Sequence, residues 1–183
     1  MRSLARPKNN RFNFNFVLEG LSSGLVDGTI CALGVVIGVS AATNDAFLTV
    51  ISGIIAGLSN SFGNSIGFYL SQVSERNVQI VNRRMGKVQH VHSKNEILLN
   101  AMFSFFSTFF VNLVILAPFL AFSIELAMAL SVILSVAVVF VLGAYNAKIT
   151  RKNFIREGLF YSALTVIGAI ISYAVGFMLH GII

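Results

Sequence analysis

One carboxylate lies in the middle of a long apolar stretch, and it is the residue of this sequence best suited to chemistry. Asp27 lies near the centre of the stretch from Phe16 to Ala42, whose only other charged residue is Glu19. A charged side chain at the centre of a membrane helix costs about 2.5–3.5 kcal/mol on insertion scales, so such residues mark ion or proton sites. The alternative interpretation is structural, a protonated acid hydrogen-bonded to a neighbouring helix. Asp27 is therefore a candidate site for a cation or a proton.

Three polar side chains of the next apolar stretch, Ala46 to Val73, are candidates to share this site. They are Asn60, Ser61 and Asn64. Asp27 is 11 residues deep in its stretch, and Asn64 and Asn60 are nine and 13 residues deep in theirs. Antiparallel packing would bring Asp27, Asn60 and Asn64 to one depth in the membrane. Oxygen ligands at one level suit a hard or borderline divalent cation. An interhelical hydrogen-bond clamp, worth about 0.6 kcal/mol per bond, is the competing interpretation.

Other polar residues give weaker signals. Glu19, two turns before Asp27, is placed to face the cytoplasmic mouth of an ion path or to snorkel to the membrane interface. His90 and His92 form an H-x-H pair, but two ligands do not make a metal site. Cys31 is the single cysteine, so no intramolecular disulfide can form. The sequence has no nucleophile–base pair and no Walker, dinucleotide or HExxH motif, so we expect no enzyme activity.

Glycines recur at four-residue spacing in the first two apolar stretches. Small residues four apart let the backbones of membrane helices approach closely. The glycines predicted to pack helices together are Gly24, Gly28, Gly34, Gly38, Gly57 and Gly67.

The elements that must hold these residues are membrane helices. Of the 183 residues, 56% are hydrophobic and 11% charged, whereas a soluble domain has about 25% charged residues. Each of five apolar stretches can cross ~30 Å of hydrocarbon as a helix, and none alternates as a barrel strand would. We therefore predict an all-α membrane protein with five transmembrane helices. The stretches are Phe16 to Ala42, Ala46 to Val73, Ile97 to Ala121, Ile124 to Tyr145 and Gly158 to Ile182.

The basic residues predict the orientation. All 13 lie in three segments: before the first helix, between the second and third, and between the fourth and fifth. Five spans put these segments on one side, and the positive-inside bias makes that side cytoplasmic, with the C-terminus outside. The short turns on the other side predict two antiparallel hairpins, of helices 1 with 2 and 3 with 4. The basic residues lie only in these polar gaps, so the net charge of +6 does not indicate nucleic-acid binding.

These boundaries give a simple domain organisation. Residues 1–15 form a basic cytoplasmic N-terminal segment, and residues 16–183 form one transmembrane domain with a cytoplasmic linker at 74–96. We expect the linker to consist of extended ends of helices 2 and 3, or of a short surface helix, with disorder as the alternative. The expected location is the cell membrane in a prokaryote and a vacuolar-type membrane in a eukaryote.

Several motifs resemble the vacuolar iron transporter (VIT) family of plants and yeast. Gly24-Leu25-Val26-Asp27-Gly28 is similar to the signature that opens the family's first helix. Gly67-Phe68-Tyr69-Leu70-Ser71, followed by Ser74-Glu75, is similar to the G-E-Y-L-S-x-x-S-x-x-E stretch that closes its second helix. Leu142-Gly143-Ala144 and the glycine-bearing fifth helix also match. The resemblance extends from about Phe16 to Met178.

This resemblance implies a function and a set of partners. Family members are dimers with five helices and a cytoplasmic N-terminus, in which a helix-1 aspartate and a helix-2 methionine line a path for Fe²⁺ or Mn²⁺, exchanged for protons. Asp27 matches the aspartate, whereas Asn64 stands at the methionine position and Phe68 at the glutamate of G-E-Y-L-S. The family's Glu- and Met-rich metal-binding domain is reduced here to a short basic linker. These departures bear on iron specificity more than on transport itself.

The sequence therefore favours a proton-coupled transporter of divalent cations from a divergent, short branch of the family. Asp27 would bind the cation when ionised and carry a proton when neutral, with neutral oxygens from Asn60 and Asn64. We expect a homodimer in the bilayer and no permanently bound cofactor; the metal ion and protons are the transported species. Two alternatives stay open: a non-transporting membrane scaffold, and a transporter of another substrate on the same fold.

Overall fold

The computed structural model describes residues 14–87, 91–149 and 151–180. These residues contain no strand, and five of their helices are long and apolar enough to cross a membrane. The prediction of an all-α protein with five transmembrane helices is therefore confirmed. The helices are α1 (Phe14–Thr43), α2 (Ala46–Arg84), α3 (Lys94–Leu116), the short 3-10 helix η1 (Ala117–Leu120), α4 (Ile124–Ile149) and α5 (Phe154–His180).

Local sequence explains where several helices begin. The Asp45 carboxylate caps α2 by accepting a hydrogen bond from the Leu48 backbone N–H at 3.0 Å. Ser93 and Glu96 form a reciprocal capping box at the start of α3. Pro118 lies in the first turn of η1, where its missing N–H is of no cost. These caps place the polar connections outside the apolar spans.

The polar segment at 74–96 is mostly a continuation of α2. This helix runs 11 residues past Val73, to Arg84, and α3 begins at Lys94. The connection packs back onto α2, because Arg76 Nε donates to the His92 carbonyl at 2.9 Å and the His92 N–H donates to Gln79 Oε1 at 3.0 Å. Extended helix ends therefore account for this segment where it is described, while His90 lies outside the described residues.

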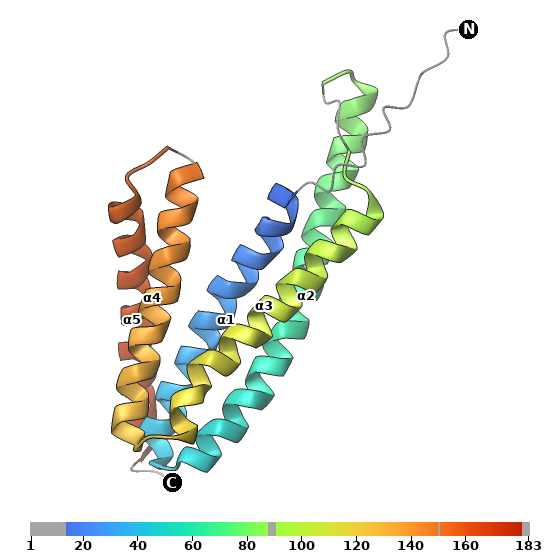
Figure 1. Ribbon diagram of the computed structural model, residues 1–183. Helices are drawn as coiled ribbons and strands as arrows, with labels where there is room; N and C mark the ends of the chain where they lie inside the picture. Colours follow the sequence, from blue (N-terminus) through green and yellow to red (C-terminus); the bar gives the residue numbers. More distant parts are fainter. Residues whose placement is uncertain (1–13, 88–90, 150, 181–183) are drawn as a thin grey trace, which may run out of the picture.

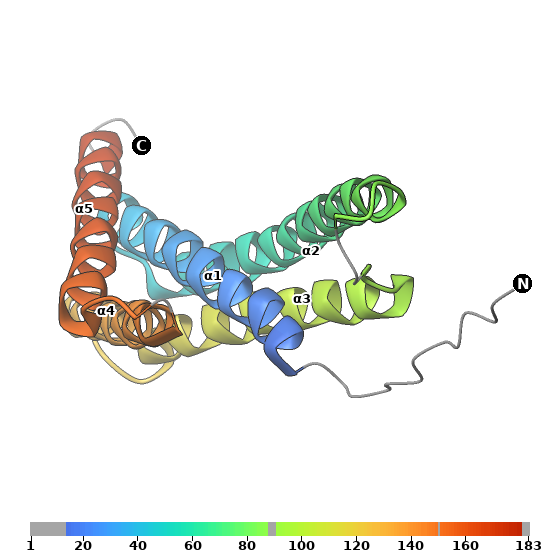
Figure 2. The ribbon, with the colours of Figure 1, turned by 90° about the horizontal axis from the view of Figure 1, so that it is seen from above.

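Helix α1 is the centre of the bundle. Viewed from above, it lies between the α2–α3 pair on one side and the α4–α5 pair on the other (Figure 2). A buried apolar core runs between α1, α3 and α4 and includes Leu33, Val36, Ile115 and Ala127. Helix α1 contacts all four other long helices, so its different faces place residues next to each of them.

The predicted hairpins are only partly observed. Helices α1 and α2 pack antiparallel along their length, as expected. By contrast, α3 and α4 meet near η1 and diverge towards their other ends (Figure 1). Helix α3 packs instead against α1 and α2, and α4 packs against α5. The glycines of α1 allow α3 to pack closely against α1, and the short connection between α3 and α4 does not make those two helices pack along their length.

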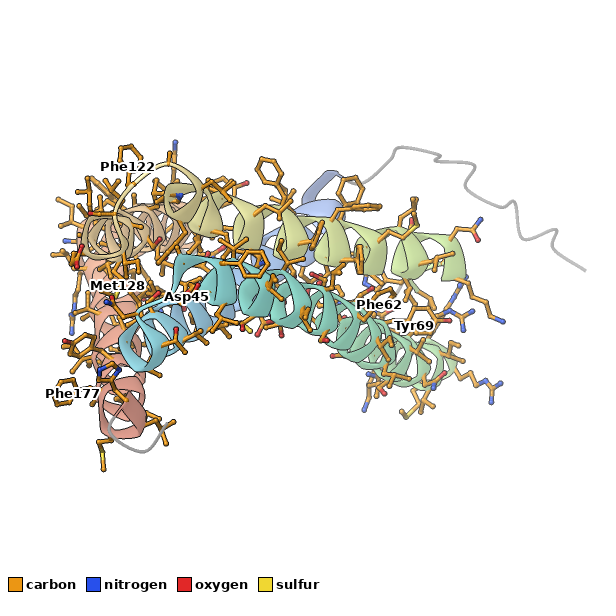
Figure 3. All side chains as sticks on the ribbon, turned by 90° about the horizontal axis from the view of Figure 1, so that it is seen from below. Asp45, Phe62, Tyr69, Phe122, Met128 and Phe177 are labelled. Carbon is orange, nitrogen blue, oxygen red and sulfur yellow. The ribbon has the colours of Figure 1, made fainter. Side chains whose placement is uncertain are left out.

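Charge and apolar surface are distributed as a bilayer requires. Every Lys and Arg of the described residues lies towards the end of the bundle that holds the α2–α3 and α4–α5 connections (Figure 1). Large apolar side chains are exposed along the helix sides; Phe177 on α5 and Phe62 and Tyr69 on α2 lie at opposite sides of the molecule (Figure 3). Such a surface is stable in lipid and would aggregate in water. The chain is an integral, multi-pass membrane protein.

Candidate ion site at Asp27

Asp27 and Asn60 meet between α1 and α2. The Asn60 side-chain amide donates to Asp27 Oδ2 at 2.8 Å, and both side chains are partly buried. This contact joins residues 33 positions apart, at the matching depth that the sequence predicts. This hydrogen bond is consistent with both interpretations of the pair, an interhelical clamp and a set of ion ligands.

Helix α1 is fixed behind Asp27 by a row of glycines that faces α3. A Cβ atom on Gly24 would collide with Ser107 Oγ and with the Ser104 carbonyl oxygen, and one on Gly28 would lie 2.6 Å from the Thr108 carbonyl oxygen. The Gly20 N–H, one turn earlier, donates to Asn100 Oδ1 at 2.8 Å. Only glycine permits so close an approach, which holds the backbone that carries Asp27 against α3.

The other predicted glycines have different partners. Gly34 and Gly38 face Ser172 of α5, at 3.4 and 3.5 Å from an added Cβ, and Gly57 faces the side chain of Asn112. Gly67, in contrast, meets nothing within 4 Å among the described residues. It therefore packs against no described helix of its own chain.

The remaining predicted ligands do not reach Asp27. The Asn64 amide donates to Thr108 Oγ1 on α3 at 2.8 Å, and the buried Ser61 hydroxyl donates to the Gly57 carbonyl of its own helix at 2.6 Å. Glu19 is exposed and lies near the side chains of Gln72, Glu75 and His92, two turns towards the basic end. Of the predicted set, the structure brings together Asp27 and Asn60.

Asp27 also lines a cavity on the side of α1 that faces α4 and α5. The cavity has a volume of about 370 Å³ and lies between α1, α4 and α5. We call it the vestibule. Its polar lining comes from Ser22, Ser23, Asp27, Asn146 and Tyr161. Asp27 therefore borders a space large enough for several waters or a partly hydrated ion.

Sequence reasoning missed the vestibule residues. Ser23 lies one helical turn before Asp27, and that spacing was a usable signal. Asn146 and Tyr161 gave none, because only the packing of α4 and α5 onto α1 brings them near Asp27.

The electrostatics leave Asp27 available to a cation. The ion pairs among the described residues join His92 to Glu75 and Lys152 to Glu157, and neither involves Asp27. The described residues also contain no cluster of three or more His, Cys, Asp or Glu side chains able to hold a metal. A cation here would be held by one carboxylate and neutral oxygens, which suits brief binding during transport better than permanent storage.

Comparisons with known proteins match most of the chain. The model of the VIT family matches residues 22–97 and 82–177. An uncharacterised protein of the archaeon Methanocaldococcus jannaschii is 26% identical over 173 residues, which cover 87% of this chain and 86% of that protein. The two matched ranges of the family model together include Asp27, Asn60 and the helices that line the vestibule.

Proposed function

The chain belongs to the VIT family, and from this premise we propose that it is a proton-coupled transporter of divalent metal cations such as Fe²⁺ or Mn²⁺. Family membership indicates transport of metal ions across a membrane rather than enzyme activity. The observation that carries the finer proposal is the position of Asp27, an acidic side chain deep in a span, without an ion-pair partner among the described residues and open to the vestibule.

The proposed exchange takes place on the Asp27 carboxylate. An ionised carboxylate binds either a metal cation or a proton, and the bound proton neutralises it. The two therefore compete for one site. In the structure the Asn60 amide nitrogen donates to this carboxylate. When a cation binds, the amide turns to present its oxygen, which is the ligand atom that hard cations prefer. Arrival of the metal and departure of the proton are then one event.

The vestibule supplies the route from the basic end of the bundle. Ser22 and Ser23 lie one turn from Asp27 on that side, and their hydroxyl oxygens replace part of the hydration shell of an incoming ion. Glu19, exposed near Glu75, attracts cations towards the same end of α1. Ser61 and Asn64 stabilise the helices around the pair, through the Gly57 carbonyl and Thr108 Oγ1.

We propose that two copies of the chain pair through α2. Ser59, Gly63, Gly67 and Ser71 follow one another at four-residue spacing, and all are exposed. An added Cβ at Gly63 or Gly67 meets nothing within 4 Å among the described residues, so this small-residue face is open to a second copy. A monomeric mass both in mild detergent and in lipid would overturn this pairing.

The orientation is tested by labelling in a Cys31→Ser background. Single cysteines at Lys8, Lys87 and Lys152 should react only from the cytoplasmic side, and a cysteine at Ile183 only from the outside. Labelling of the cysteine at position 87 from the outside would contradict the proposed five-helix topology.

Transport is tested in proteoliposomes that contain an internal pH dye. Fe²⁺, Mn²⁺, Co²⁺ and Zn²⁺ are added one at a time, with empty liposomes as the control. We expect uptake of at least one metal together with a rise of internal pH, because protons leave as the metal enters. A panel in which no metal enters faster than into empty liposomes would contradict the proposal and favour the clamp, a scaffold in which the Asp27–Asn60 bond only joins α1 to α2.

A further inference from the structure

A second cavity lies outside the Asp27 site, between the basic ends of α4 and α5. Its volume is about 650 Å³, within the usual size of a small-molecule site. Three cations line it, Lys148, Arg151 and Lys152, together with Tyr145 and the apolar Val141 and Phe154. It shares no lining residue with the vestibule. The transport proposal therefore assigns it no role.

The cavity lies at the boundary of the apolar spans. The membrane-spanning part of α4 ends at Lys148 and that of α5 begins at Phe154. Lys148 therefore lies at the end of the span, Arg151 and Lys152 lie in the connection, and Val141 lies about two turns deeper. A ligand that fits this lining is negative at one end and apolar at the other. An anionic phospholipid has that chemistry, and it is present at this depth in a membrane.

Two of the three cations have no ion-pair partner among the residues that the structure describes. Lys152 Nζ lies 3.5 Å from Glu157 Oε1, whereas Lys148 and Arg151 form no ion pair with any described residue. Uncompensated positive charge gathered at a cavity is the electrostatic requirement for a phosphate group.

The backbone at Arg151 provides a second, independent observation. Its φ is +55°, in the left-handed region that favours glycine. The Lys152 N–H donates to the Ala147 carbonyl at 2.9 Å and the Arg151 N–H to the Lys148 carbonyl at 3.4 Å, the two bonds of a helix ending at which glycine is the usual residue. The other positive-φ positions among the described residues are Asn44 and Gly86, both suited to it. Arginine is conformationally disfavoured here, and its side chain lines the cavity, which points to a role for the guanidinium.

We propose that this cavity binds the phosphate headgroup of an anionic phospholipid. Arg151 and Lys148 contact the phosphate, and Val141 and Phe154 contact the beginning of an acyl chain. The experiment uses the full chain in mild detergent and measures retention of phosphatidylglycerol and of phosphatidylcholine by native mass spectrometry. We expect phosphatidylglycerol to be retained more tightly, and equal retention of the two lipids would overturn the proposal.

Arg151→Gly separates ligand binding from folding. Glycine suits the left-handed backbone, so the melting temperature should stay the same or rise, while affinity for phosphatidylglycerol falls about fivefold, since one Lys or Arg at an anionic surface is worth about 1 kcal/mol. Adding Lys148→Gln should bring the loss to about 25-fold. Arg84→Gln removes a cation from the end of α2, away from the cavity, and should change neither quantity.

The remaining outcomes distinguish the source of the phosphate. Inorganic phosphate at millimolar concentration should not displace the lipid, because it lacks the apolar part of the ligand. Full displacement would assign the cavity to a free anion and overturn the lipid proposal. Unchanged retention in both Arg151→Gly and the double variant would overturn it as well.

Discussion

The two faces of α1 differ in how closely they are packed. Towards α3, Gly20, Gly24 and Gly28 approach so closely that a single methyl group on Gly24 would collide with the α3 backbone. Towards α4 and α5, the same turns of α1 border the vestibule of about 370 Å³. Asp27 lines the vestibule and accepts a hydrogen bond from the Asn60 side chain on α2.

This difference indicates a division of labour within one helix. The face with Gly20, Gly24 and Gly28 fixes the position and rotation of α1. The face with Ser22 and Ser23 borders a cavity large enough for an ion to approach. A transport site needs both properties, because a ligand must be held in place while its surroundings admit and release the ion. Changes on the first face should affect folding, and changes on the second should affect transport.

The largest expected effect is on the glycine face. In Gly24→Ala, the added methyl group meets the Ser104 carbonyl oxygen, a backbone atom that cannot rotate away, so we expect a loss of stability of about 3 kcal/mol. Thermal unfolding in detergent measures it. Gly168→Ala on α5 is the matched control, since its Cβ meets nothing within 4 Å among the described residues, and it should be neutral or slightly stabilising. Equal melting temperatures for the two variants would disprove the close packing of α1 on α3.

On the vestibule face, a bulky residue should stop transport and leave folding intact. Ser23→Leu fills part of the cavity beside Asp27, and we expect metal uptake to fall at least about tenfold, with a melting temperature near that of the parent. Ser23→Ala keeps the space but removes one of the two hydroxyl groups, so uptake should fall much less than in the leucine variant. Full activity of the leucine variant would show that the ion takes another route.

A smaller effect is expected at the partner of Asp27. Asn60→Ala removes the 2.8 Å hydrogen bond, which costs about 0.6 kcal/mol of stability and should raise the KM for the metal several-fold, because a ligand is lost. Asn64→Ala breaks a bond to Thr108 instead, so it should cost similar stability with a smaller change in KM. A larger change in KM for Asn64→Ala than for Asn60→Ala would show that Asn64, and not Asn60, is the metal ligand.

The smallest expected effect is a change of preference among metals. Asn64→Met introduces a thioether one turn from Asn60, and soft ligands favour the later and softer transition metals. We expect the uptake ratio of Fe²⁺ to Mn²⁺ to rise a few-fold, measured by competition in one vesicle preparation. The effect is limited because position 64 faces Thr108 rather than Asp27. An unchanged ratio would remove residue 64 from the ion path.

The sequence predicted the parts of this site that depend on local pattern and depth. Five apolar runs predict five helices, which the structure has. Antiparallel packing predicts one depth for Asp27, Asn60 and Asn64, and in the structure Asn60 is hydrogen-bonded to Asp27. Depth does not give rotation about a helix axis, however. Asn64 and Ser61 have the right depth, but their side chains bond to α3 and to their own helix.

Tertiary packing accounts for what the sequence did not predict. The vestibule exists because α4 and α5 dock onto α1 at the level of Asp27, and no short-range pattern in α4 or α5 encodes that docking. Likewise, Gly24 and Gly67 both belong to rows of small residues at four-residue spacing, yet Gly24 packs against α3, whereas an added Cβ at Gly67 meets nothing within 4 Å among the described residues.

The central claim is that a metal ion and a proton exclude each other on Asp27. Its most direct test is simultaneous measurement of metal uptake and internal pH in proteoliposomes that contain either the parent or Asp27→Asn. Asparagine keeps the shape and hydrogen-bonding capacity of the side chain but removes its charge and its titration. We expect the variant to fold and insert as the parent does and to lose both metal uptake and metal-driven proton flux. Asp27→Asn vesicles that take up metal and export protons at the parental rate would contradict the claim.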